Sequence, residues 1–112
     1  MATITETNLN MIRGDTLAFA VEIDGLEGQT LSSAYFSVKA DASDTEYTLQ
    51  KSLSDGISEV EAGKYRVRVA PEDTANVEPG TYRYDLQIGA NGDIFTVLRG
   101  KLKIVEDITR EV

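Results

Sequence analysis

The feature of this chain that most constrains its fold is the alternation of apolar and polar residues with a period of two. In "TLAFAVEI" (16–23), "KYRVRVA" (64–70) and "TYRYDLQIG" (81–89), every second residue is a large apolar or aromatic one. Successive side chains of a strand point to opposite faces, so this spacing predicts three strands with one buried face each. The same pattern predicts strands in "SAYFSVKA" (33–40) and "EYTLQKSL" (46–53), and a first strand in "NLNMI".

The last long apolar segment, "DIFTVLRGKLKIVE", changes the phase of its alternation. Phe95 and Val97 lie on one face of an extended strand, whereas Leu102 and Ile104 lie on the other. A β-bulge, which inserts one extra residue into a strand, would bring both pairs to the same side. We predict this bulge near residues 99–100, because the glycine there accepts the backbone conformations that bulges need.

Turn signals separate these strands. Asn91-Gly92 is a strong hairpin signal, so the strands on either side of it are predicted to be antiparallel neighbours. "DGLEG" after Ile23 and "SDGIS" after Leu53 predict further turns, since Asp and Gly accept positive φ angles. "APEDTANVEPG" interrupts the alternation with a proline and two acidic residues, which favour the first turn of a helix. It predicts one or two helical turns over residues 71–77.

About seven short strands and one short crossover helix predict an all-β fold, an immunoglobulin-like antiparallel β-sandwich. In such sandwiches a tyrosine at the start of the sixth strand bonds back to the backbone of the preceding connection, and Tyr82 or Tyr84 after Pro79-Gly80 fits that position. A small β-barrel is the alternative. The 112 residues show no linker or internal repeat, so we expect a single domain over residues 1–112.

Composition excludes most catalytic chemistry. The chain has no cysteine and no histidine, which removes thiolate nucleophiles, disulfides, the commonest general base and the commonest transition-metal ligand. Asp41, Asp44 and Glu46 offer the oxygen ligands that Ca²⁺ prefers, but their spacing lacks the order of a calcium loop and fits a solvated acidic loop better. We expect no enzymatic activity, no catalytic residue, no metal and no cofactor.

Charge points away from nucleic acid and membranes. The net charge is −8, whereas nucleic-acid binding depends on Lys and Arg neutralising phosphates. No apolar run approaches the roughly 20 residues that span a bilayer, and the N-terminus does not resemble a signal peptide, so we expect an unexported chain. The charge is uneven: residues 1–63 carry 3 basic and 11 acidic side chains, whereas residues 64–103 carry 7 basic and 5 acidic ones.

The segment "MIRGDTLAF" contains Arg13-Gly14-Asp15, the tripeptide that integrins bind in adhesive proteins. Short motifs of this kind occur often by chance. The glycine stands directly between two apolar stretches, where a tight connection between strands requires it, and an aspartate there can bond the backbone two residues on. The sequence therefore favours a structural connection over an adhesion signal.

Four motifs in order carry a resemblance to a known family: "RGDT", "FSVKAD", "KYRVRVAPEDTANVEPGTYRYDLQI" and "GKLKIVEDITR". From about Met11 to Arg110 the chain resembles the β-sandwich found as the N-terminal domain of baseplate upper proteins in tailed phages, and related phage and prophage tail domains. The resemblance implies a non-enzymatic virion module, made in the host bacterial cytoplasm, that docks onto a tail or baseplate in several copies. Baseplate proteins continue beyond such a domain, so this chain is expected to be either a free-standing virion protein or part of a longer one.

The surface expected to bind other virion proteins, or copies of the chain itself as a homo-oligomer, is basic. In an immunoglobulin-like arrangement the third, sixth and seventh strands share a sheet, which places on one outer face Tyr35, Lys39, Arg83, Arg99, Lys101 and Lys103. The alternative interpretation of these charges is a solvated exterior that protects strand edges. The alternative function is an immunoglobulin-like adhesion or carbohydrate-binding module, which the position of all five tyrosines in or beside strands disfavours.

Overall fold

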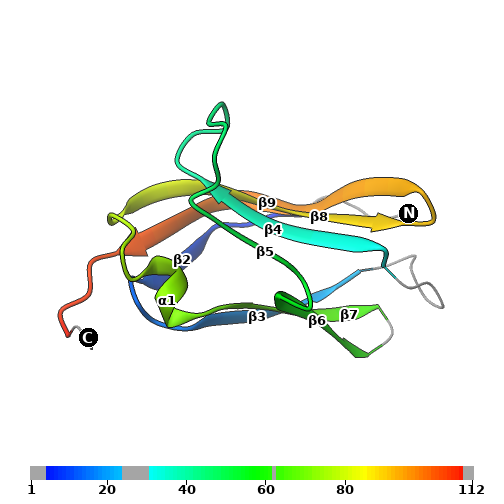
Figure 1. Ribbon diagram of the computed structural model, residues 1–112, viewed down its shortest axis with the longest axis horizontal. Coiled ribbons are helices and arrows are strands. Elements are labelled where there is room, and N and C mark those ends of the chain that lie inside the picture. The colour runs from blue at the N-terminus through cyan, green and yellow to red at the C-terminus, as the bar shows by residue number, and fades with distance from the viewer. Residues whose placement is uncertain (1–4, 24–30, 62, 110–112) are drawn as a thin grey trace.

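The computed structural model describes residues 5–23, 31–61 and 63–109 (Figure 1). This part of the chain is all-β apart from one helical turn, as predicted. The elements along the chain are β1 (Thr5–Glu6), β2 (Leu9–Ile12), β3 (Leu17–Glu22), β4 (Ser33–Lys39), β5 (Leu49–Leu53), β6 (Gly56–Glu61), β7 (Lys64–Val69), α1 (Pro71–Thr74), β8 (Gly80–Ala90) and β9 (Asp93–Val105).

The described strands form one mixed sheet that is nearly barrel-shaped. Its order is β1-β9-β8-β4-β5-β6-β7-β3, and β2 also pairs with β9, in parallel. Figure 1 shows β4, β8 and β9 in one layer, facing β3, β6 and β7 in the other. A short parallel contact between β5 and β6, at Ser52↔Gly56 and Leu53↔Ile57, joins the two layers into a continuous sheet.

The predicted sandwich of about seven strands is not confirmed in that form. The described residues form nine strands in a single sheet, and its curvature brings the fold towards the small-barrel alternative. Most of the difference comes from β1 and β6, which the alternation of the sequence does not mark. β6 has only one buried side chain, Ile57, while Val60 is 60% exposed, so this strand lacks a periodic apolar face.

The strands that alternate in sequence also alternate in burial. In β7 exposed and buried residues alternate from Lys64 to Val69 without exception. In β4 the buried side chains are Ala34, Phe36 and Val38. Phe36 is fully buried and packs edge-on against Phe19 across the two layers, with ring centroids 5.6 Å apart. The largest side chains that are completely buried are Phe36, Ile57, Leu86, Ile88, Leu102 and Ile104.

The bulge predicted near residues 99–100 exists, but its predicted position is wrong. Leu86 pairs with Leu98 and Gln87 with Thr96, so Val97 is the extra residue of β9. Val97 and Leu98 are consequently both buried. Gly100 has a different role, because a Cβ there would lie 1.9 Å from the Thr7 carbonyl oxygen.

The predicted hairpin at Asn91-Gly92 is confirmed. Both residues have positive φ, 53° and 82°, and they connect β8 directly to β9 as antiparallel neighbours. The turn between β5 and β6 is also present, with positive φ at Ser54 and Gly56. "DGLEG" (24–28) lies outside the described residues.

The crossover helix is shorter than predicted: α1 covers Pro71–Thr74, whereas the prediction was residues 71–77. Asp73 accepts a hydrogen bond of 2.7 Å from the Ala70 N–H, which satisfies one backbone donor at the helix start. The chain then turns through a hydrogen bond from the Val77 N–H to the Thr74 carbonyl, and Pro79 prevents further helix.

The predicted tyrosine corner is confirmed, since the Tyr82 hydroxyl donates to the Glu78 carbonyl oxygen.

Candidate protein-interaction face

The structure brings the predicted interaction residues onto the outer face of one layer. We call the set Tyr35, Lys39, Arg83, Arg99, Lys101 and Lys103 the basic face. β8 lies between β4 and β9, and in each of these strands the buried residues alternate with those of the basic face. Alternation fixes the side on which each residue lies, and strand pairing fixes its neighbours.

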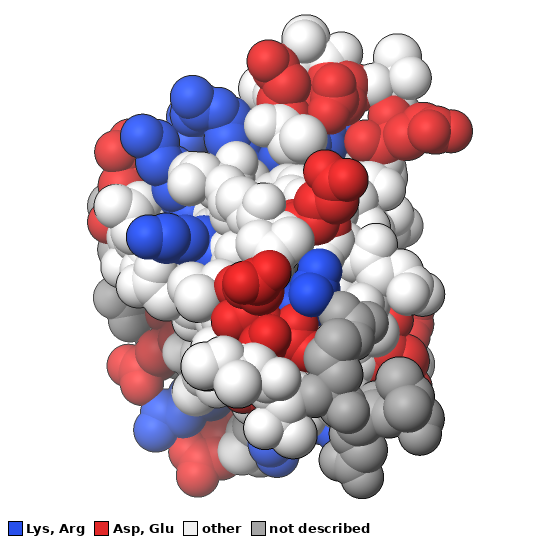
Figure 2. Space-filling model, turned by 90° about the vertical axis from the view of Figure 1, so that its left-hand side faces the viewer, with Lys and Arg blue, Asp and Glu red and all other residues white. Residues whose placement is uncertain are grey.

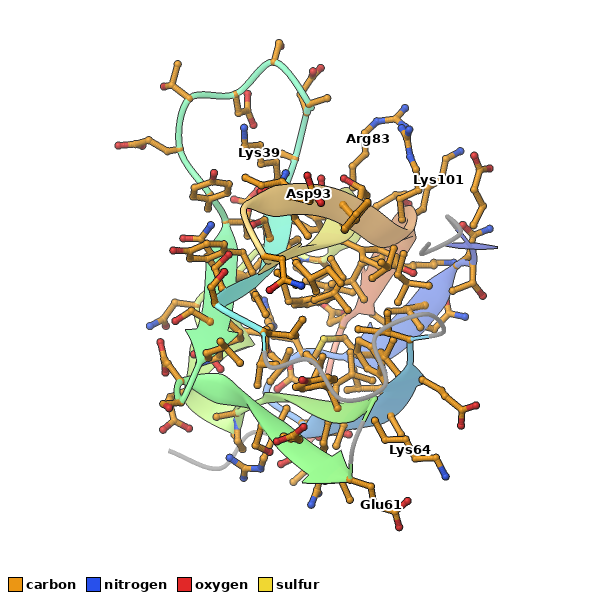
Figure 3. The ribbon with its side chains drawn as sticks, turned by 90° about the vertical axis from the view of Figure 1, so that its right-hand side faces the viewer. Lys39, Glu61, Lys64, Arg83, Asp93 and Lys101 are labelled. Atoms are coloured by element: carbon orange, nitrogen blue, oxygen red, sulfur yellow. The ribbon has the colours of Figure 1, made fainter. Side chains whose placement is uncertain are left out.

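Three cations of the basic face form one row across three strands. Lys39 on β4 is the register partner of Arg83 on β8, and Arg83 is in turn the partner of Lys101 on β9. Figure 3 shows the three side chains extending from the same side of the sheet. Neighbouring strands are about 4.8 Å apart, and like charges directly opposite one another destabilise a sheet. The row therefore imposes an electrostatic cost on the isolated domain.

The other basic residues extend the row along β9. Lys103 is opposite Thr81, and Arg99 is opposite Asp85. Partial burial raises the pKa of the Asp85 carboxyl, while Arg99 and Lys39 act in the opposite direction. Carboxylates flank Arg99 on both sides, because Glu6 of β1 is its other register partner.

Tyr35 lies on the same outer face but apart from the cationic row. Its register partner is Gln87, and the row of Ser37, Asp85 and Arg99 separates it from Lys39. Tyr47, which no sequence pattern marked as an interaction residue, is closer: the Lys39 ammonium lies 4.9 Å from the centre of its ring, and the residue is 49% exposed. A tyrosine just outside a strand, eight residues after a lysine, gives no local signal of such a cation–π contact.

Within the described part of the chain, none of the cations Lys39, Arg83, Arg99, Lys101 and Lys103 forms an ion pair of 4.0 Å or less. Figure 2 shows lysine and arginine side chains gathered along one side of the molecule in that view. Cations that lie next to one another without a close ion pair can bind a partner that supplies negative charge.

Arg13-Gly14-Asp15 is a connection between β2 and β3, as predicted. The Arg13 Nε lies 2.8 Å from Asp107 Oδ1, and both side chains are largely buried. Gly14 has φ 82°, and its N–H donates to Thr74 Oγ1 at 2.9 Å. The Asp15 N–H closes the turn on the Ile12 carbonyl. An integrin ligand needs its arginine exposed, whereas the Arg13 side chain is largely buried and paired with Asp107.

The acidic loop that follows β4 is held by its own hydrogen bonds. Asp41 Oδ1 accepts from both the N–H and the hydroxyl of Ser43, and these bonds lower the pKa of the Asp41 carboxyl. Asp44 accepts from the Asp41 N–H. Over the residues that the structure describes, no cluster of His, Cys, Asp or Glu is arranged to hold a metal ion.

No protein-family model matches the chain, and no curated protein is significantly similar to it. In the described ranges no helix has the length and apolar character to cross a membrane.

Proposed function

We propose that this chain is a non-enzymatic structural module of a phage or prophage virion. It docks in a tail or baseplate assembly by placing its basic face against acidic surface of another virion protein or of another copy of itself. The observation that carries the proposal is the row of Lys39, Arg83 and Lys101, which lacks ion pairs in the described structure and places like charges opposite one another; Arg83 and Lys101 are exposed and Lys39 is half-buried. A partner that supplies carboxylates would remove this repulsion.

We further propose that the strands follow an immunoglobulin-like arrangement. Support comes from the pairing of β3 with β7 in one layer and of β4, β8 and β9 in the other. The parallel pairing of β2 with β9, the helical crossover and the bond from Tyr82 to Glu78 agree with that arrangement. The contact between β5 and β6 is the departure from two separate sheets.

The localisation and assembly follow from the same proposal. The chain is made in the host bacterial cytoplasm and is incorporated into the virion there, without nucleic acid, a membrane or a cofactor as partner. An exposed ion pair contributes only about 0–1 kcal/mol, so docking through this face requires several pairs at once or several copies. The interaction of an isolated domain is thus expected to be weak and to depend on salt.

The test is charge reversal on the basic face. Arg83, Lys101 and Lys103 are replaced together by Glu, and the amount of the chain in purified particles is measured. We expect incorporation to fail, because three attractive contacts become repulsive. The matched control, Arg83→Lys with Lys101→Arg and Lys103→Arg, keeps the charge and should assemble normally.

Circular dichroism and thermal unfolding establish that both triple variants are folded. Normal incorporation of the folded Glu variant at low and moderate salt would refute the proposal and leave the basic face as a solvated exterior. Loss of incorporation in the charge-preserving control would instead show that shape or hydrogen-bond geometry, rather than charge, governs the contact.

A further inference from the structure

A second surface of the molecule, on the opposite layer, has the properties of a self-association edge. β3 pairs with β7 through six consecutive residue pairs, from Leu17↔Val69 to Glu22↔Lys64, without a bulge. The strand order ends at β3, so its other edge has no strand partner among the described residues. β3 runs along the lower border of the molecule in Figure 1. A terminal strand presents backbone N–H and C=O groups to which another strand can bind.

β3 lacks the features by which proteins protect such an edge. Its sequence, "LAFAVE", contains no proline, no lysine and no glycine, and its register is regular. Its single charge, Glu22, lies 3.7 Å from the ammonium of Lys64 in the neighbouring strand. The edge is therefore flat and nearly neutral along most of its length.

The inner face of β3 is also incompletely covered. Its three inward apolar residues are only partly buried, whereas their register partners in β7 are at most 3% exposed. The partly buried residues are Leu17, Phe19 and Val21, and the buried partners are Val69, Val67 and Tyr65. A strand added to the free edge would cover the side of this row that β7 does not reach.

The outer face of the same strand pair determines what can bind. There Ala18 is opposite Arg68, Ala20 is opposite Arg66, and Glu22 is opposite Lys64. Both arginines are exposed and form no ion pair within the described residues. The two alanines leave space over β3 into which the long arginine side chains can extend.

We propose that β3 pairs antiparallel with β3 of a second copy, with Ala20 directly opposite the partner's Ala20. This register pairs residues 18–22 of both strands and sets Ala18 opposite the partner's Glu22. Across the joined sheet one row then contains Arg68, Ala18, the partner's Glu22 and the partner's Lys64. Arg68 and the partner's Glu22 are two strand spacings apart, roughly 10 Å between backbones, with only a methyl group between them. The two-fold symmetry produces this pair twice.

The neighbouring register does not have this complementarity. If Phe19 were opposite the partner's Phe19, then Ala18 would be opposite the partner's Ala20. The corresponding row would contain Arg68 and the partner's Arg66, with no acidic residue between them. Charge therefore selects the register centred on Ala20 over the one centred on Phe19, although both pair similar lengths of strand.

The test is the oligomeric state of the full chain by sedimentation equilibrium over a range of protein and salt concentrations. We expect a dimer whose dissociation constant rises with salt. Arg68→Glu should raise the dissociation constant about tenfold or more, because two attractive pairs become repulsive. The double variant Arg68→Glu with Glu22→Arg restores opposite charges and should recover the dimer.

Two further variants separate this edge from other surfaces. Ala20→Lys places two lysines opposite one another at the two-fold axis and should abolish the dimer, while the fold is checked by circular dichroism. Lys103→Glu makes the same charge change as Arg68→Glu but lies on the basic face, so it should leave the dimer unchanged. Because the virion proposal concerns the basic face, particle incorporation and dimerisation can fail independently.

A chain that sediments as a monomer at every concentration would overturn the proposal. So would a dimer that survives both Arg68→Glu and Ala20→Lys with its dissociation constant unchanged. If the folded double charge-swap variant stayed monomeric, the register centred on Ala20 would be refuted.

Discussion

Lysine and arginine occur in two places with opposite electrostatic surroundings. One is the end of the molecule near the crossover helix α1, which we call the crossover end, and the other is the basic face. At the crossover end Arg13 bonds Asp107, and Lys51 bonds Asp73 of α1 at 2.9 Å; all four side chains are less than 20% exposed. On the basic face the exposed Arg83 lies between two other cations of its own layer.

The difference shows which charges belong to the fold. A largely buried cation such as Arg13 or Lys51 must be paired, since an uncompensated charge away from water costs several kcal/mol. An exposed cation is solvated and can remain unpaired until a partner arrives. Substitutions at the crossover end should therefore change stability, whereas those on the basic face should change association.

The largest effect is expected at the turn that orders the crossover end. Gly14→Val should lower the free energy of unfolding by about 3 kcal/mol, because a β-branched residue resists a φ of 82°. Urea unfolding measures this change. Asp15→Glu in the same turn is the control and should be nearly neutral. Equal loss in both variants would show that the length of the Asp15 side chain matters as much to the turn as the backbone conformation of Gly14.

A smaller loss is expected at α1. Asp73→Ala removes both the bond to the Ala70 N–H and the ion pair with Lys51, and should cost about 2 kcal/mol. Asp73→Asn keeps a hydrogen-bond acceptor without the charge, so it should lose roughly half as much stability as Asp73→Ala, measured by thermal unfolding. If the two variants were equally unstable, the ion pair would account for the whole effect.

Adjacent residues of β8 allow the comparison to be made within one strand. The Tyr84 side chain is buried and its hydroxyl donates to the Thr7 carbonyl at 2.7 Å, whereas Arg83 points outward. Burial raises the pKa of Tyr84 from 10.0 to about 12, so the folded chain keeps a proton that the unfolded chain releases. The stability present below pH 10 is consequently lost as the pH rises towards 12.

Tyr84→Phe tests that alkaline dependence. The variant should lose about 1 kcal/mol at neutral pH with the hydrogen bond, and its stability should fall less steeply above pH 10 than that of the parent chain. Tyr65 and Tyr82, whose pKa values are also raised, leave part of the slope in place. An unchanged slope would mean that Tyr84 is not protected from titration in the folded chain.

The smallest effect is expected on the basic face and has the opposite sign. Arg83→Gln removes the central cation of the row and should stabilise the isolated domain by a few tenths of a kcal/mol at low salt. The gain should vanish at high salt, where surface charges are screened. Gln50→Glu makes a charge change of the same size on β5, which β4 separates from β8, and controls for net charge. A loss of stability in Arg83→Gln would show that the row is not repulsive.

Local alternation made much of the fold predictable. Apolar residues at every second position lie on the same side of a strand. The buried faces of β3, β4, β7 and β8 could therefore be predicted from the sequence without knowing which strands they pair with. The Asn91-Gly92 hairpin and the Tyr82 corner were also local, because the residues that form each lie within a few positions of one another. Alternation likewise predicted which side of its strand each basic-face residue occupies, whereas their placement on one face depended on the predicted arrangement of the strands.

Contacts between distant segments were decided only by the tertiary structure. Alternation cannot specify that Arg13 meets Asp107, 94 residues away, or that the row joins Lys39, Arg83 and Lys101, because it contains no information on pairing register. The bulge moved to Val97 because the pairing of β8 with β9 determined which residue was extra. Gly100 is instead required by the close passage of Thr7. A single sequence determines which side of a strand is buried, whereas the partner across the strand depends on how the whole sheet closes.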